Sequence, residues 1–285
     1  FDVSPTSTTL SHGTITTCSL LLLRDNMIAW KKITLLPFLC FNLQTVVLAG
    51  AAEDIAMEAD KRLHGYGDSI ATLKMTLISP SNESAERTLR VKNLDVGKDG
   101  DRSLMIFDTP RDVSGTALLS HTRSDSEDLQ WLYLPAISRV KQISARNKSG
   151  PFMASEFAFE DIVTPYWQKF SYKLLREEKC EALTCFVLER KPTDTNSGYT
   201  KQLVWIDKQD YLQRRIEFFD RKDSLLKVYT ATGFKKLQNA YWRPAQMLMV
   251  NQQTHKQTRL DWSDYQFKTG LNKDDFSENA LKRVK

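Results

Sequence analysis

The chain has 285 residues, of which 41% are hydrophobic and 26% are charged, and its formal net charge is +5 at neutral pH. This is the composition of an ordinary globular protein with enough material for one large core or two small ones. The mild positive charge permits contact with anionic lipid headgroups or an acidic partner, but it does not indicate a nucleic-acid-binding protein.

The N-terminal residues carry a pattern typical of export. Residues 1–26 contain Ser and Thr clusters and a run of leucines, and we interpret them as a non-domain extension, with the true start at Met27; a longer signal n-region is the alternative. Residues 27–51 combine a basic start, an apolar run and the small residues Ala49-Gly50-Ala51, which predicts a cleaved secretory signal peptide. A retained membrane anchor is the alternative, although polar residues interrupt the apolar run.

Cleavage would leave residues 52–285 as a single domain in the periplasm. Of the cysteines, Cys180 and Cys185 remain after cleavage. Two nearby cysteines in an exported chain predict a local disulfide, with a pair of unlinked thiols as the alternative.

The first segment of the predicted mature domain is a helix. From Glu53 to about Leu63 the apolar residues recur at helical spacing, and Gly65 and Gly67 then end the helix. We interpret these glycines as a helix end, since a nucleotide-binding motif would follow a strand and would hold a third glycine.

After Ser69 the period changes to two, which predicts short strands joined by turns. The predicted strands of the first half are 72–78, 86–96, 103–108, 115–122, 128–134 and 138–143. Those of the second half are 170–178, 183–191, 199–207, 212–220, 225–235, 241–250 and 258–267, followed by a short terminal helix at 273–284. This spacing indicates an antiparallel meander that forms a barrel or a sandwich.

One segment departs from the strand pattern. Residues 150–165 crowd Phe152, Met153, Phe157 and Phe159 among acidic side chains and serine. We predict a lid segment, Gly150–Asp161, that covers apolar surface. An ordinary helix packed on the core is the alternative.

Catalytic patterns are sparse. After residue 51 the histidines are His64, His121 and His255, and none has a second histidine at metal-ligand spacing. The sequence has no nucleophile elbow and no phosphate-binding loop of the Walker type. We therefore expect neither an enzyme nor a metal or other cofactor.

Several strands are apolar on both faces, as in residues 129–134, 203–206 and 247–250. An antiparallel sheet with one face in water needs only one apolar face. A curled sheet around an apolar cavity would use both, and methionine suits a lining that adapts to variable chains. A sandwich without a cavity is the alternative.

Two blocks in the middle of the chain, 131–143 and 148–162, resemble the outer-membrane lipoprotein-sorting protein family, whose members are LolA-like carriers. Weaker similarity extends over most of residues 53–284, including Cys185-Phe186-Val187-Leu188-Glu189 and Tyr241-Trp242-Arg243-Pro244. The sequence departs from the family pattern at Ala154 and around Asp223-Ser224, where the family usually has glycine, and this puts the local turn geometry in question.

The resemblance implies a mainly β (α+β) fold, an incompletely closed antiparallel β-barrel of about eleven strands with helices covering its mouth. It also implies a periplasmic carrier of lipoprotein or lipid acyl chains, expected to be a monomer, with an inner-membrane RND/MMPL-type exporter or an outer-membrane acceptor as partner. An accessory subunit that docks on such an exporter is the alternative function. The expected lipid-binding residues are Trp131, Tyr133, Phe152, Met153, Phe157, Phe159 and Trp205. On this hypothesis the lid segment moves aside to admit cargo, and replacing Phe157 with Asp should impair cargo uptake more than folding.

Overall fold

The computed structural model describes residues 43–284, and β-strands predominate in them. The expected extension of residues 1–26 and residues 27–42 of the predicted signal peptide lie outside the described part. Within residues 43–284, no helix has the length and apolar character needed to cross a membrane.

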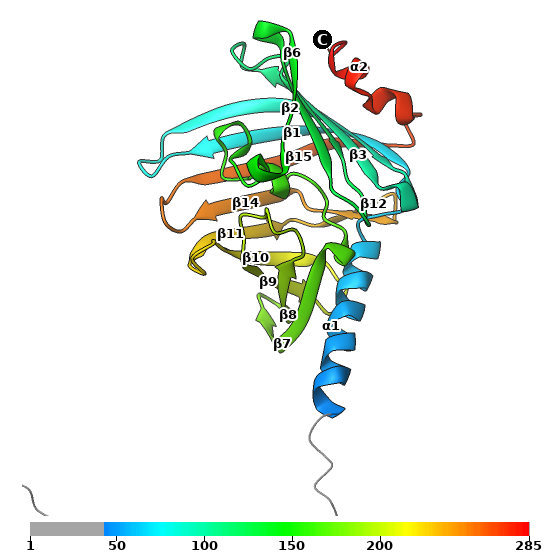
Figure 1. Cartoon of the computed structure of the whole chain (residues 1–285), viewed down its shortest axis with the longest axis vertical. Coiled ribbons are helices and arrows are strands. Elements are labelled where there is room, and N and C mark those ends of the chain that lie inside the picture. Colours follow the sequence, from blue (N-terminus) through cyan, green and yellow to red (C-terminus); the bar gives the residue numbers. More distant parts are fainter. Residues whose placement is uncertain (1–42, 285) are drawn as a thin grey trace, which may run out of the picture. The chain divides into compact units, whose positions relative to one another are not determined.

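In the described chain, thirteen strands form one antiparallel sheet in the order β6-β5-β4-β3-β2-β1-β15-β14-β11-β10-β9-β8-β7 (Figure 1). The first six of these strands are β1 (Asp68–Ile78), β2 (Ser84–Asp95), β3 (Asp101–Thr109), β4 (Ala117–His121), β5 (Leu129–Leu134) and β6 (Arg139–Gln142). The others are β7 (Phe170–Cys180), β8 (Leu183–Pro192), β9 (Lys201–Asp207), β10 (Gln213–Phe219), β11 (Leu225–Thr232), β14 (Gln246–Asn251) and β15 (Gln257–Phe267). Two short strands, β12 (Lys235–Leu237) and β13 (Tyr241–Arg243), pair with each other.

The mainly β fold with a few helices is confirmed, but the expected barrel of about eleven strands is wrong in both strand number and closure. Within the described residues, β6 and β7 stand at opposite ends of the strand order and do not pair, so the sheet is open. Two predicted strands are each divided, 225–235 near Gly233 at φ 65° and 241–250 at Pro244. A left-handed backbone and a residue without an N–H both interrupt a strand's hydrogen-bond pattern.

The strand order gives the connection between β6 and β7 an unusual course. These strands are consecutive in the sequence but lie at the two edges of the sheet, so residues 143–169 must cross its width. The connection contains the short 3₁₀ turns η3 (Ala145–Asn147), η4 (Phe152–Ala154), η5 (Phe159–Asp161) and η6 (Trp167–Lys169). Figure 1 shows this green segment lying over one face of the sheet. The lid segment is thus part of a crossover connection.

Helix α1 (Leu43–Lys61) packs beside strand β7 (Figure 1). Its buried residues Ala52, Ile55, Ala56 and Ala59 recur at helical spacing and join the main core. Gly65 and Gly67, which the sequence assigned to the helix end, adopt positive φ angles of 83° and 75°. The predicted helix at Glu53–Leu63 is therefore present and extends further toward the N-terminus.

The sheet buries apolar side chains on both faces, as its sequence indicates. The inner face, which faces the connection, carries the main core, including Leu73, Leu89 and Phe107. On the outer face, a second cluster around Leu104 and Leu119 packs against the C-terminal turn η7 (Lys273–Phe276) and the short helix α2 (Glu278–Leu281). The remaining 3₁₀ turns are η1 (Gly97–Asp99) and η2 (Pro135–Ile137).

Candidate functional site

A cavity of about 810 Å³ lies between the inner face of the sheet and the connection from β6 to β7. Small-molecule sites typically have volumes of about 300–1,000 Å³, so its size suits a ligand such as an acyl chain. Exposed lining residues, among them Arg62, Asp125 and Asp194, mark where the cavity meets solvent.

Much of the lining is apolar and comes from strands far apart in the sequence. The apolar side chains share the inner face of β2, β3, β10, β11, β14 and β15, and include Val91, Met105, Ile216, Phe218, Met247, Met249 and Leu260. Three of these are methionines, which are flexible and polarizable enough to pack against differently shaped chains. This part of the cavity can remove hydrocarbon from water.

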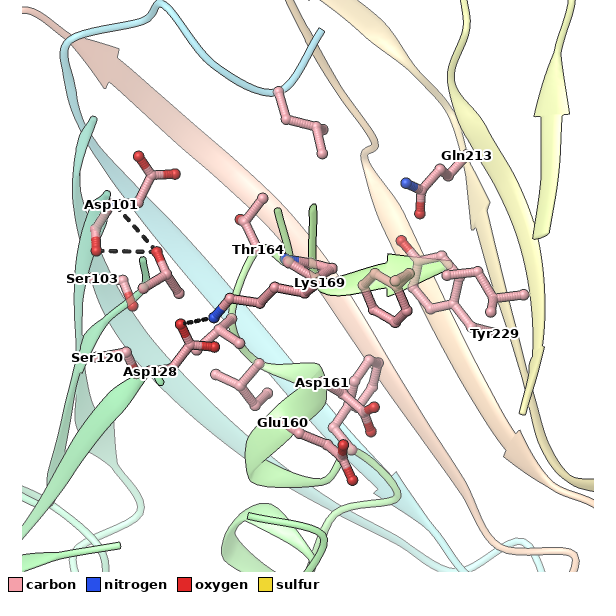
Figure 2. Close-up of a pocket in the computed structure, with 18 of the residues that line it drawn as sticks. Asp101, Ser103, Ser120, Asp128, Glu160, Asp161, Thr164, Lys169, Gln213 and Tyr229 are labelled. Atoms are coloured by element: carbon pink, nitrogen blue, oxygen red, sulfur yellow. Dashed lines mark hydrogen bonds and ion pairs between the residues drawn. The ribbon is translucent and has the colours of Figure 1, made fainter. Parts of the chain in front are cut away.

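The lining also has a polar side. Figure 2 shows Ser103, Ser120 and Asp128 on one wall, with Gln213 and Tyr229 on the wall across from them. Asp128 accepts an ion-pair hydrogen bond from Lys169 of the connection. The cavity is therefore amphiphilic, with polar groups on both walls, and we call the wall of Ser103, Ser120 and Asp128 its polar side.

A buried acidic group closes the polar side where α1 ends. Asp101 accepts a hydrogen bond from the hydroxyl of Tyr166 at 3.2 Å, and its other oxygen lies 3.6 Å from Nε2 of His64. Burial raises the pKa of Asp101 to about 6, even though the nearby His64 lowers it. Burial also raises the pKa of Asp60, which accepts a hydrogen bond from the Trp167 N–H at 3.3 Å. Contacts between α1, β3 and the connection therefore depend on protonation.

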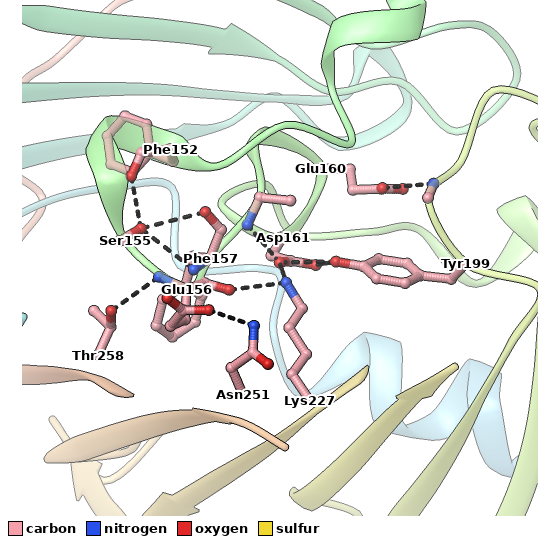
Figure 3. A network of polar contacts seen from close by, with 12 residues as sticks. Phe152, Ser155, Glu156, Phe157, Glu160, Asp161, Tyr199, Lys227, Asn251 and Thr258 are labelled. Atoms are coloured by element: carbon pink, nitrogen blue, oxygen red, sulfur yellow. Dashed lines mark hydrogen bonds and ion pairs between the residues drawn. The ribbon is translucent and has the colours of Figure 1, made fainter. Parts of the chain in front are cut away.

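The lid segment is fixed to the sheet by a buried carboxylate (Figure 3). Asp161 accepts hydrogen bonds from Lys227 Nζ at 2.5 Å, from the Tyr199 hydroxyl at 2.9 Å and from the Ala158 N–H at 2.7 Å. The side chains of Asp161 and Lys227 are each 5% exposed. Removing one partner of such a pair leaves an uncompensated buried charge, at a cost of about 3–5 kcal/mol.

Further contacts hold the lid segment on both sides. The N–H of Glu156 donates to Thr258 Oγ1 at 2.9 Å, and its carboxylate accepts from Asn251 at 2.8 Å. On the other side, Gln130 Nε2 donates to the carbonyl of Phe159 at 3.0 Å. The segment thus links β14 and β15 to β5 and forms a wall of the cavity. Its predicted movement stays a prediction.

Glu160 anchors the same segment to the loop before β9. It accepts hydrogen bonds from the Ser197 hydroxyl at 2.8 Å and from the Gly198 N–H at 2.9 Å. Burial raises its pKa, although these two hydrogen bonds favour the ionised form. A Cβ on Gly198 would lie 2.9 Å from the Cβ of Ser149, so the close approach of this loop requires glycine.

The expected lipid-binding residues are distributed over both faces of the sheet. Phe157 lines the cavity, whereas Phe152, Met153 and Phe159 of the same segment pack in or against the main core. Three others lie on the outer face: Trp131 and Tyr133 belong to the cluster near α2, and Trp205 packs with Cys185 and Val187. The indole N–H of Trp205 donates to Glu178.

The polar residues of the site were not predicted from the sequence. Lys227 and Gln130 each interrupt an apolar strand, and this interruption was the available signal, whereas Tyr199 lies in a polar loop and carries no such signal. Among the described residues, the buried side-chain atoms without a hydrogen-bond partner include two from cavity-lining residues, Gln130 Oε1 and Trp262 Nε1. Such atoms are rare in folded proteins, so each calls for an explanation.

The predicted disulfide between Cys180 and Cys185 is present, with a Cα–Cα distance of 5.8 Å. It joins the ends of β7 and β8, and β7 is an edge strand. For metals, no group of three or more His, Cys, Asp or Glu side chains within the described residues could hold an ion.

Comparison with known proteins finds a family model and several solved structures that each match most of the chain. A family model described as "-like: Uncharacterized protein" matches residues 99–283. An outer-membrane lipoprotein-sorting protein domain from Vibrio parahaemolyticus is 51% identical, with 82% of this chain and 100% of that chain covered and a TM-score of 0.80. A DUF1329 family protein from Desulfovibrio piger is 30% identical, with 82% and 99% covered and a TM-score of 0.78.

A LolA superfamily protein from Nitrosomonas europaea is 21% identical, with 80% of this chain and 98% of that chain covered and a TM-score of 0.66. At this identity the likeness concerns the fold alone. No curated protein matches the chain.

Proposed function

Because the chain belongs to the family of the outer-membrane lipoprotein-sorting protein domain, we propose that it is a periplasmic carrier of lipoprotein or lipid acyl chains. The acyl chains occupy the cavity on the inner face of the sheet during transfer toward the outer membrane. The carrier acts by binding and release, without a chemical step. The amphiphilic cavity, large enough for a hydrocarbon tail, is the observation that carries this proposal.

The energetics favour a reversible carrier. Each methylene removed from water contributes about 0.8 kcal/mol, so sheltering part of a long chain yields several kcal/mol. That free energy keeps the chain out of water and still permits transfer to an acceptor that binds more of it. Where the cavity meets solvent, near Arg62, Asp125 and Asp194, the polypeptide or the outer part of the head attached to the acyl chain can reach water.

The proposal is tested by the lipid content of gently purified protein, measured by extraction and mass spectrometry. We expect the wild-type protein to retain acyl lipid. Met247 of β14 lines the cavity, whereas Leu248 is adjacent and faces the other side of the sheet. Met247→Glu should therefore lose most of the bound lipid, and Leu248→Glu, the matched control, should retain it.

Absence of lipid from the wild-type protein, together with no binding of added acyl lipids, would contradict the carrier function. It would favour an accessory subunit that docks on an inner-membrane exporter. Equal lipid content in the two variants would also contradict the use of this cavity.

A further inference from the structure

A row of uncharged polar side chains crosses the inner face of the sheet. Antiparallel register pairs Asn93 of β2 with Ser103 of β3, Ser103 with Ser120 of β4, and Ser120 with Gln130 of β5. On the other side, Asn93 pairs with Ser69 of β1. We call these five residues the polar row. Residues paired across adjacent strands share one face and are close neighbours, so the row is continuous.

The rows on either side of the polar row differ in character. A shift of two residues along each strand in one direction leads from the polar row to an apolar row in the same register. This apolar row consists of Val91, Met105, Leu118 and Leu132. In the other direction, Asp95 pairs with Asp101. The inner face thus changes from apolar, through uncharged polar, to acidic. A lipid lies along such a gradient in one orientation, with its tail over the apolar row.

The polar row lines the cavity. Asn93, Ser103, Ser120 and Gln130 all belong to its lining, and Figure 2 shows Ser103 and Ser120 on its wall. Gln130 is 1% exposed, and its Nε2 donates to Ser120 Oγ at 3.3 Å and to the Phe159 carbonyl at 3.0 Å. Its Oε1 is buried without a partner. This atom has almost no accessible surface, so a ligand donor reaches it only when the lid segment, which Gln130 contacts at Phe159, moves aside. Such a bond would recover the cost of an unpaired buried acceptor, about 1–3 kcal/mol.

We propose that the polar row is a headgroup subsite that selects acyl lipids whose first polar group is uncharged and carries a hydrogen-bond donor, a hydroxyl or an amide N–H. This inference rests on the proposed carrier function and specifies its ligand. The donor binds Gln130 Oε1. The hydroxyls of Ser103 and Ser120 and the amide of Asn93 bind the neighbouring polar atoms of the ligand.

The charge of the surroundings supports an uncharged head. Asp128 is already paired with Lys169, and Lys148, which is buried, donates to Glu127 at 2.8 Å and to the Asp128 carbonyl. These cations are therefore engaged by the protein. An anionic head at the polar row would face Asp101 on its acidic side.

The test compares two lipids with the same hydrocarbon chain. Monooleoylglycerol carries hydroxyl donors, and methyl oleate carries an ester without a donor. Dissociation constants for both lipids are measured by displacement of a fluorescent acyl probe from the full protein, and the readout is the ratio of the two constants. Because each variant is compared with itself, a general loss of stability does not change this ratio.

Gln130→Leu removes the unpaired acceptor, and Ser120→Ala removes its neighbour while leaving the lid contact at Phe159. We expect Gln130→Leu to reduce the preference for monooleoylglycerol about tenfold, since 1.4 kcal/mol corresponds to a factor of ten, and Ser120→Ala to reduce it several-fold. Trp262→Phe is the matched control. It removes the unpaired N–H of another cavity-lining residue, which lies outside the polar row, so the ratio should stay unchanged.

An unchanged ratio in Gln130→Leu and Ser120→Ala would overturn the headgroup subsite, and the carrier function would stand. Failure of both lipids to displace the probe from the wild-type protein would instead contradict the carrier function itself.

Discussion

Ala154 is held at φ 61°, in the left-handed region that a Cβ disfavours. Its side chain is exposed, so it gains little from packing. Ala154→Gly should therefore raise the free energy of unfolding by about 1 kcal/mol. Ala158, at φ −78°, is the control: Ala158→Gly should lower the free energy of unfolding, because glycine there adds freedom to the unfolded chain and removes a buried methyl group. Chemical denaturation measures both, and a destabilised Ala154→Gly would refute the strain.

Asp101 makes stability depend on pH. Its pKa of about 6 lies above the ordinary value of 3.8, so the folded state favours the protonated carboxyl. The resulting stabilisation is complete below about pH 4 and is lost as the pH rises through about 6. The groups that face Asp101 are His64, Tyr166, Asp60 and Asp95.

Asp101→Asn keeps an acceptor for the Tyr166 hydroxyl and removes the charge. The variant should therefore gain stability relative to the wild-type protein as the pH increases from 4 to 7. Urea unfolding at a series of pH values measures the difference. A difference that stays constant over this range would show that Asp101 does not titrate as described.

Residue types alone identified the disulfide and the crowded aromatic segment, but they did not tell which face each strand residue occupies. Trp131 is next to Gln130 in β5, so the two side chains point to opposite faces. Because both faces are apolar, the sequence does not reveal which is inside. The outward position of Trp131 follows from packing against Phe276 and Leu281, more than 140 residues away. The polar row could not be predicted from the sequence, because it depends on the register of five strands.

At the scale of elements, most predicted strands occur close to their expected positions, since period-two patterns are local. The divided strands were not anticipated, although Gly233 and Pro244 were visible in the sequence. Replacement of Phe157 by Asp, suggested by the lid hypothesis, no longer separates uptake from folding. Phe157 is 3% exposed and lies in the main core, so a charge there should also destabilise the fold.

Thr258→Val tests the lid segment more cleanly. It removes the hydroxyl that accepts from the Glu156 N–H while almost preserving the side-chain shape. If the segment opens to admit cargo, amide exchange at Glu156–Ala158 and the uptake rate of an acyl probe should both increase several-fold. Hydrogen exchange and stopped-flow fluorescence measure these rates. Faster exchange with an unchanged uptake rate would mean that opening of the segment does not control cargo entry.

At the scale of the molecule, the mainly β class follows from strand spacing, and the relatives support it. The order of the strands could not be derived in the same way, because pairing between distant segments leaves no local pattern. The expectation of an incompletely closed barrel of about eleven strands fails for this reason: β6 and β7 are neighbours in sequence, yet the whole sheet lies between them.

The pairing of β1 with β15 joins the two halves of the sheet, so it determines when the cavity can form during folding. Strands β1 to β6 can pair in turn as a nascent chain emerges, since each lies beside its predecessor. The pairing of β1 with β15 forms only after β15, which begins at Gln257, has been synthesised. Contacts of such high sequence separation form slowly. Since the cavity takes its walls from both halves, it is complete only after β15 has paired with β1, and the proposed cargo could enter only after that step.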